Sequence, residues 1–89
     1  DGPQLGLALR ALTRDEKRQV GVDSGLLVDD AEGAAARAGI EQGDIVLAIN
    51  GKPVKGLDDI RAVLKPHPKQ VALLIKRDDE TLFVPMPLN

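Results

Sequence analysis

The sequence predicts a small α+β domain, mostly β, in which five to six antiparallel strands form a curled sandwich or partly open barrel capped by two to three helices. With 89 residues, the chain has room for one domain and one modest core, so we expect residues 1–89 to form a single unit. Aliphatic runs of strand length recur along the chain, and turn residues separate them. Helix signals occur in short stretches between these runs.

Composition narrows the classes of function. Apolar residues make up 43% and charged residues 29%, as in ordinary soluble proteins, and no apolar run approaches the roughly 20 residues of a membrane helix. The net charge of −2 comes from interleaved basic and acidic residues without a basic, aromatic stripe, so nucleic acid is not an expected partner. Cysteine is absent, which excludes disulfides and thiolate chemistry. The chain starts at Asp1 without a signal segment, so we expect a segment of a longer protein.

The first extended segment is Leu5 to Leu9, in which three leucines share one face. Gly6 interrupts it, and such a glycine marks a weakened edge strand, a bulge, or a place where another backbone comes close. Thr13 and Glu16 then form a capping box, which predicts a helix from Arg14 to Val20 ended by the next glycine. This helix is almost entirely charged, so we interpret it as a solvated connector.

The middle of the chain contains the strand that the others are expected to surround. Gly25 to Val28 is a strand that Asp29-Asp30 ends, and Ala34 to Ala38 is a short helix that a glycine ends. Ile45 to Ile49 is apolar on both faces, so this strand must lie in the middle of the fold.

Turns bound this central strand on both sides. Gly43-Asp44 precedes it, and Asn50-Gly51, a strong hairpin signal, follows it. Lys52 to Val54 is then the returning arm of the hairpin, with Pro53 suited to an edge or a strand end.

The helix from Leu57 to Leu64 carries the most informative spacing. Pro66 prevents it from continuing much further. Its apolar residues form two stripes at helical period, which are Ile60, Val63 and Leu64, and beside them Leu57, Arg61 and Leu64. A broad apolar arc of this kind is normally core, whereas a second stripe interrupted by an arginine is typical of a helix that borders a cleft.

Two strands close the chain. Val71 to Lys76 and Thr81 to Met86 are joined by the charged turn from Arg77 to Glu80. Phe83, the single aromatic residue, lies on the face opposite the apolar side chains of its strand. Pro85 and Pro87 indicate that the end of this strand lies at an edge.

The residues do not assemble a recognisable catalytic or metal site. Ser24, the single serine, lies in a turn without the glycine-flanked elbow of a nucleophile, and His67 stands between two prolines. The glycines are too dispersed for a phosphate-binding loop, so no cofactor is expected. Three acidic pairs do not have the spacing of a calcium-binding loop. We interpret Asp29-Asp30 as a strand end, Asp58-Asp59 as the first turn of a helix and Asp78-Asp79 as a hairpin turn.

The chain resembles a PDZ domain of the bacterial type over nearly its whole length. The resemblance is carried by Leu5-Gly6-Leu7, the segment from Gly33 to Ile40, Gly43-Asp44-Ile45, Ile49-Asn50-Gly51 and the helix from Leu57 to Leu64. It is most similar to the second, C-terminal PDZ domain of an HtrA/Deg-type periplasmic serine endoprotease.

This resemblance implies a peptide-binding site. PDZ domains add an extended peptide, commonly a free C-terminus, beside an exposed edge strand, and loop N–H groups bind its carboxylate. The carboxylate loop would be Gln4, Leu5, Gly6 and Leu7, with Gln4 replacing the family's first glycine; the groove would be lined by Ala8, Leu9, Leu57, Ile60, Arg61 and Leu64. Leu5, Leu7 and Leu64 would surround the last side chain of the peptide.

Two residues set the expected preference of this groove. Leu57 aligns where many PDZ domains carry a histidine, so apolar peptide side chains are expected there, and Arg61 would narrow the groove or favour an acidic peptide residue. Gly6→Val is expected to abolish peptide binding while leaving the fold mostly intact.

The resemblance also implies the wider setting. The chain would be a non-catalytic module in the periplasm that binds peptides or the C-termini of unfolded proteins, in a protease with a role in protein quality control. In this family the second PDZ domain often serves oligomer assembly instead, through contacts with other domains and subunits of the parent protease. Alternatives are a PDZ scaffold of a secretion system and a PDZ domain within a membrane-embedded protease.

Overall fold

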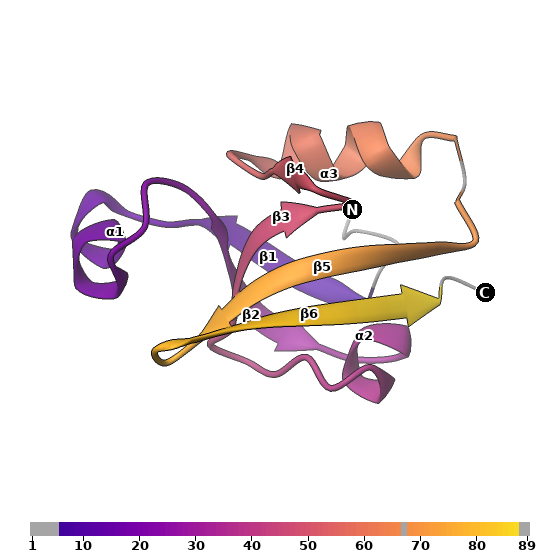
Figure 1. Cartoon of the computed structure of the whole chain (residues 1–89), viewed down its shortest axis with the longest axis horizontal. Coiled ribbons are helices and arrows are strands. Elements are labelled where there is room, and N and C mark those ends of the chain that lie inside the picture. Colours follow the sequence, from indigo (N-terminus) through magenta and orange to yellow (C-terminus); the bar gives the residue numbers. More distant parts are fainter. Residues whose placement is uncertain (1–5, 67, 88–89) are drawn as a thin grey trace.

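The computed structural model of the chain describes residues 6–66 and 68–87. It confirms a mostly β fold, with one antiparallel sheet of six strands and three helices (Figure 1). The strand order is β1-β2-β3-β5-β6, with the short β4 paired to β3. The elements are β1 Leu7–Ala11, α1 Arg14–Val20, β2 Leu26–Ala31, α2 Ala34–Arg37, β3 Ile45–Ile49, β4 Lys52–Pro53, α3 Leu57–Leu64, β5 Gln70–Arg77 and β6 Glu80–Pro87.

β3 is the central strand, as its two apolar faces predict. It pairs with β2 near its start and with β4 near its end on one side, and with β5 on the other. Ile45, Val46 and Ile49 are all buried. A strand buried on both faces has no need of alternation, which explains the continuous aliphatic run.

The prediction that Asp29-Asp30 ends the second strand is wrong, because β2 continues to Ala31. Ala8 pairs with Asp30 and Leu9 with Val28, so Asp29 is an extra residue that forms a β-bulge. Both aspartates are exposed, so their charges remain in water at little cost.

β1 starts later than predicted. It begins at Leu7 rather than Leu5 and runs to Ala11, whose pairing with Leu26 extends the ladder beyond Leu9. Leu5 lies outside the described residues, and Gly6 forms a bend with φ +81°. This left-handed backbone cannot continue a strand, so the bend fixes where β1 begins.

The two longer helices have the predicted bounds. Thr13 Oγ1 accepts a hydrogen bond from the Glu16 N–H at 3.1 Å, and Glu16 Oε1 accepts one from the Thr13 N–H at 2.8 Å, which confirms the capping box of α1. Asp59 plays a similar part for α3, because its carboxylate accepts from the Lys55 and Gly56 N–H groups at 2.7 and 3.2 Å.

One apolar core joins the sheet to α2 and α3. Most of the sheet contributes to it, together with Ala35 of α2 and Ile60 and Leu64 of α3. In the view of Figure 1, α3 lies above the sheet and α2 below it. Phe83 projects from the other face of β6 and is 68% exposed. No helix within the described residues is both long and apolar enough to cross a membrane.

Candidate functional site

The outer edge of β1 is the first feature of the candidate site. β1 ends the strand order, and within residues 6–66 and 68–87 no strand pairs with its outer side. The Gly6 C=O accepts a hydrogen bond from the Glu32 N–H at 2.8 Å, so it points toward the β2 side. The next N–H, that of Leu7, points the opposite way because the peptide bond is trans. Strand alternation then directs the backbone groups of Leu7 and Leu9 to the free edge.

α3 lies against β1 and forms the second wall of the candidate site. The side chains of Leu7, Ile60 and Leu64, all predicted to line the pocket or groove, are buried in the core. Leu9 is half-buried, whereas Ala8 is exposed and Leu57 is 36% exposed. The structure therefore brings the two predicted walls together, and it leaves Leu57 as the large apolar side chain that faces solvent on α3. Gln4 and Leu5 lie outside the described residues.

Gly6 has a structural role that the sequence did not reveal. A Cβ at this position would lie 2.2 Å from the Glu32 carbonyl oxygen, and φ is in the left-handed region. Gly6→Val would therefore strain the junction between β1 and the segment before α2. The expectation that this substitution leaves the fold mostly intact did not include this contact, in which the first obstacle is the protein's own backbone.

Arg61 lies on the exposed side of α3, one turn after Leu57. Its guanidinium Nη1 lies 3.2 Å from Asp58 Oδ1, in a pair whose side chains are 63% and 96% exposed. An exposed i,i+3 pair of this kind is weak, so the guanidinium can exchange this partner for another carboxylate.

The opposite edge of the sheet, β6, lacks two of its outward backbone donors. Arg77 and Glu80 close a two-residue loop, so their backbones are hydrogen-bonded to each other. Along the two strands, non-hydrogen-bonded and hydrogen-bonded pairs then alternate, and the backbone groups of a non-hydrogen-bonded pair face away from the partner strand. Pro85 and Pro87 fall on the positions whose backbone faces outward, where a proline offers no N–H. The prediction that these prolines mark an edge strand is confirmed.

An ion pair between a buried aspartate and a half-buried arginine, absent from the predictions, holds the β5 end of the sheet. Asp44 is only 3% exposed, and its carboxylate accepts from Arg77 Nε at 2.9 Å and from Nη2 at 2.6 Å. Arg77 also donates to the Gly39 C=O, and the Glu41 N–H donates to Asp44. Burial opposes ionisation of Asp44, but these hydrogen bonds outweigh it and lower its pKa. The same contacts raise the pKa of Arg77.

A second ion pair joins the end of β1 to α1. Arg10 donates to the Glu16 carboxylate at 2.9 and 2.7 Å and lies 3.5 Å from Asp29. The hydrogen bond from Arg10, with that from the Thr13 N–H, lowers the pKa of Glu16 from 4.5 to about 2. The contact raises the pKa of Arg10. Charged side chains therefore fix α1 to the strand before it. The helix itself has no buried residue.

The remaining candidates for catalysis or metal binding do not form a common site among the described residues. Ser24 is half-buried in a bend, and His67 lies outside the described residues. Within the part of the chain that the structure describes, no group of three or more histidine, cysteine or acidic residues is placed to hold a metal ion.

The fold, the free edge of β1 and the adjoining α3 are the features of a peptide-binding PDZ domain, and the sequence agrees. Residues 29–77, more than half of the chain, match the family model described as PDZ domain, so the chain belongs to this family. It is 33% identical over 73 residues to the periplasmic serine endoprotease DegP of Salmonella typhimurium, covering 80% of this chain and 15% of that protein. It is 38% identical over 61 residues to the regulator of sigma-W protease RasP of Bacillus subtilis, covering 67% of this chain and 14% of that protein.

A solved structure supports the same fold. The HtrA3 PDZ domain bound to a phage-derived ligand, FGRWV, superposes with a TM-score of 0.81 at 22% identity, over 93% of this chain and 81% of that chain. The chain itself spans only about 15% of the length of the DegP relative.

Proposed function

We propose that this chain is the non-catalytic peptide-binding module of a periplasmic serine endoprotease and that it adds the C-terminal end of a peptide or unfolded protein as a strand beside β1. The single observation that carries this proposal is the free edge at Leu7 and Leu9, beside α3. The similarity to DegP supports the protease and the periplasmic setting. A role in protein quality control is part of the proposal. The catalytic residues would belong to another domain of the parent protein.

The resemblance to PDZ domains suggests how a peptide would be oriented. Its carboxylate would lie at the start of β1, near the loop from Gln4 to Leu7, and its preceding residues would run toward Ala11. Each backbone hydrogen bond to Leu7 or Leu9 would contribute about 1 kcal/mol net. Leu57 would favour apolar peptide side chains, and Arg61 would favour an acidic one, since its present partner Asp58 is highly exposed.

One observation favours a second function, assembly of the parent oligomer. Leu7, Ile60 and Leu64 are packed into the core, so their side chains have apolar partners without a peptide. A domain that does not use these residues for a peptide would instead contact other domains or subunits of the protease. The similarity to RasP supports a third setting, a different kind of protease.

NMR titration with peptides ending in valine, leucine, phenylalanine or alanine tests the leading proposal. We expect shifts confined to β1 and α3 that disappear when the peptide is amidated; a dissociation constant of about 10 µM would correspond to about −7 kcal/mol. Absence of shifts at millimolar peptide would contradict strand addition and favour the assembly role.

A matched pair of variants isolates the backbone contribution. Leu9→Pro and Leu9→Ala both remove the half-buried side chain, but only the proline also removes the outward N–H. We expect Leu9→Pro to bind peptide about fivefold more weakly than Leu9→Ala. Equal affinities would place the peptide elsewhere.

A further inference from the structure

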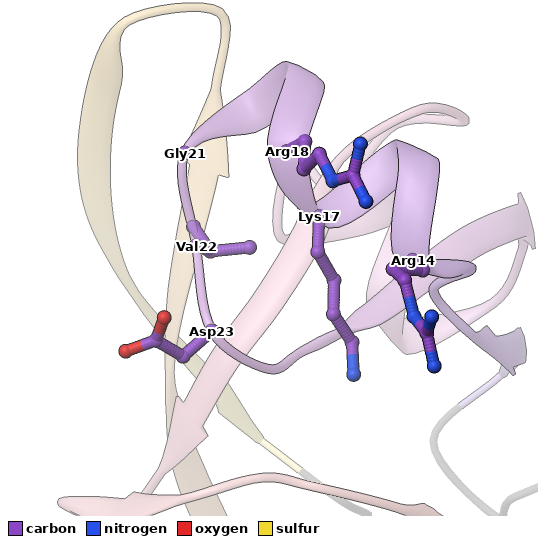
Figure 2. Close-up of a pocket in the computed structure, with 6 residues that line it drawn as sticks. All are labelled: Arg14, Lys17, Arg18, Gly21, Val22 and Asp23. Atoms are coloured by element: carbon purple, nitrogen blue, oxygen red, sulfur yellow. The ribbon is translucent and has the colours of Figure 1, made fainter.

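A shallow basic hollow lies beside α1, on residues to which the peptide groove assigns no role (Figure 2). It has a volume of about 350 Å³ and opens broadly to solvent. Its lining consists of three cations of α1 and the turn that follows the helix: Arg14, Lys17, Arg18, Gly21, Val22 and Asp23.

The three cations share one face of the helix. Lys17 and Arg18 follow Arg14 by three and four residues, which places all three side chains within one arc of α1. Two acidic residues stand between them in sequence: Glu16 is bound to Arg10, and Asp15 is exposed and is not part of the lining. The hollow therefore concentrates positive charge on a chain whose net charge is −2.

These cations have no acidic partner in the described part of the chain, since none of them lies within 4.0 Å of a carboxylate there. Arg10, Arg61 and Arg77 each have such a partner. Asp23 is the acidic residue of the lining, and in Figure 2 its carboxylate points away from Lys17. The three positive charges therefore repel one another, and a bound anion would reduce this repulsion.

The turn after α1 gives the hollow a defined shape. Gly21 adopts φ +74°, and the Lys17 C=O accepts hydrogen bonds from the N–H groups of Gly21 and Val22 at 2.9 and 3.1 Å. This closure brings Val22 beside Lys17 as the apolar wall of the hollow. The cations are therefore presented by a capped helix with a fixed end rather than by a loose tail.

We propose that this hollow is a docking site for an acidic segment of another protein, separate from the groove between β1 and α3. Charge complementarity favours an acidic segment as the ligand, because three cations without an acidic partner within two helical turns match consecutive glutamates or aspartates. Membrane binding would need large apolar side chains around the cations, and the hollow offers only Val22. Single-stranded nucleic acid would need aromatic stacking platforms, and Phe83 is the only aromatic residue of the chain.

NMR titration of the 89-residue chain with octaglutamate, acetylated and amidated at its ends, tests this proposal. The amide removes the free carboxylate that the groove would bind, so the two sites give separate results. We expect shifts concentrated between Arg14 and Asp23, an affinity at least about tenfold weaker at high than at low salt, and no shifts with octaglutamine. Shifts at β1 and α3 instead would overturn the proposal.

Two matched triple variants complete the test. Arg14→Gln, Lys17→Gln and Arg18→Gln keep good helix formers in α1, whereas Arg37→Gln, Lys52→Gln and Lys55→Gln remove the same charge from exposed cations elsewhere. We expect the first variant to lose at least about tenfold in affinity and the second to change less than about twofold. Equal losses of affinity in the two variants would show that octaglutamate responds to the overall charge of the chain, and would overturn the proposed site.

A titration with vesicles of phosphatidylglycerol and phosphatidylcholine tests the other kind of ligand. If vesicles shift the NMR signals of α1 and octaglutamate does not, the proposal of an acidic protein segment is overturned.

Discussion

The two edges of the sheet differ although both strands could accept another strand. β1 directs the backbone groups of Leu7 and Leu9 outward and carries no proline. β6 has Pro85 and Pro87 at outward positions and so lacks two donors there. The difference shows how one sheet can keep an edge for strand addition while it prevents uncontrolled pairing at the other.

The two edges are also anchored differently. Near β6, the ion pair between Asp44 and Arg77 is largely buried and ties the end of β5 to the loop before β3. Near β1, the pair between Arg10 and Glu16 is more exposed and joins α1 to β1, and Arg10 also lies 3.5 Å from Asp29 of β2. Stability should therefore depend more on the first pair, which leaves the β1 edge supported mainly by its backbone and its leucines.

The largest expected effect is that of Asp44→Ala. The change leaves Arg77 without its carboxylate and removes the acceptor of the Glu41 N–H, so the free energy of unfolding should fall by about 3 kcal/mol. Urea denaturation would measure this loss. Asp58→Ala is the matched control, because its pair with Arg61 is highly exposed and should contribute less than about 0.5 kcal/mol. Equal losses for the two variants would contradict the contrast between the anchors.

The next effect is expected at Gly6, where β1 begins. Gly6→Ala should destabilise the fold by about 2 kcal/mol, because it adds a collision with the Glu32 carbonyl to the cost of a left-handed alanine. Gly39→Ala has the same backbone cost at φ +99° but meets no atom within 4 Å. A denaturation midpoint for Gly6→Ala no lower than that of Gly39→Ala would show that the junction yields freely.

Local signals predicted the helices well, and long-range contacts account for what was missed. The capping box of Thr13 and Glu16 is complete within four residues, so the sequence alone could place α1. Asp44 and Arg77 are 33 residues apart, and Asp44 follows a glycine in what looks like an ordinary turn. No local pattern distinguishes an aspartate that will be buried from one that remains exposed.

The same limit applies to the candidate site. The spacing of α3 showed an apolar arc beside an arginine, but only the packed fold shows that Ile60 and Leu64 are buried while Leu57 remains partly exposed. The bulge at Asp29 was equally hidden, since it depends on pairing with β1. Gly6 was singled out as unusual from sequence, yet its cause, the Glu32 carbonyl, lies on another segment.

Acid should weaken the anchor beside β1 in a defined range of pH. The pKa of Glu16 is about 2 in the folded chain against an ordinary 4.5, so its contribution is complete above about pH 4.5 and is lost as the pH falls toward 2. The difference in unfolding free energy between the wild-type chain and Glu16→Gln should therefore shrink over this range. Urea denaturation at several pH values measures it. A difference that stays constant down to pH 2 would mean that the charge of Glu16 contributes nothing.

The smallest expected effect on stability belongs to the blocked edge. Pro85→Thr combined with Pro87→Thr should change the free energy of unfolding by less than about 0.5 kcal/mol, because both residues are exposed and face away from β5. Two restored N–H groups should nevertheless let β6 pair with another copy, beside the exposed Phe83. Analytical ultracentrifugation should then detect self-association that rises with concentration and that the wild-type chain lacks. Thr81→Pro, which removes another outward donor, should not increase association. If the double variant stays as monomeric as the wild type, the prolines are not what distinguishes β6 from β1, and the twist of the strand or its charged turn must protect this edge.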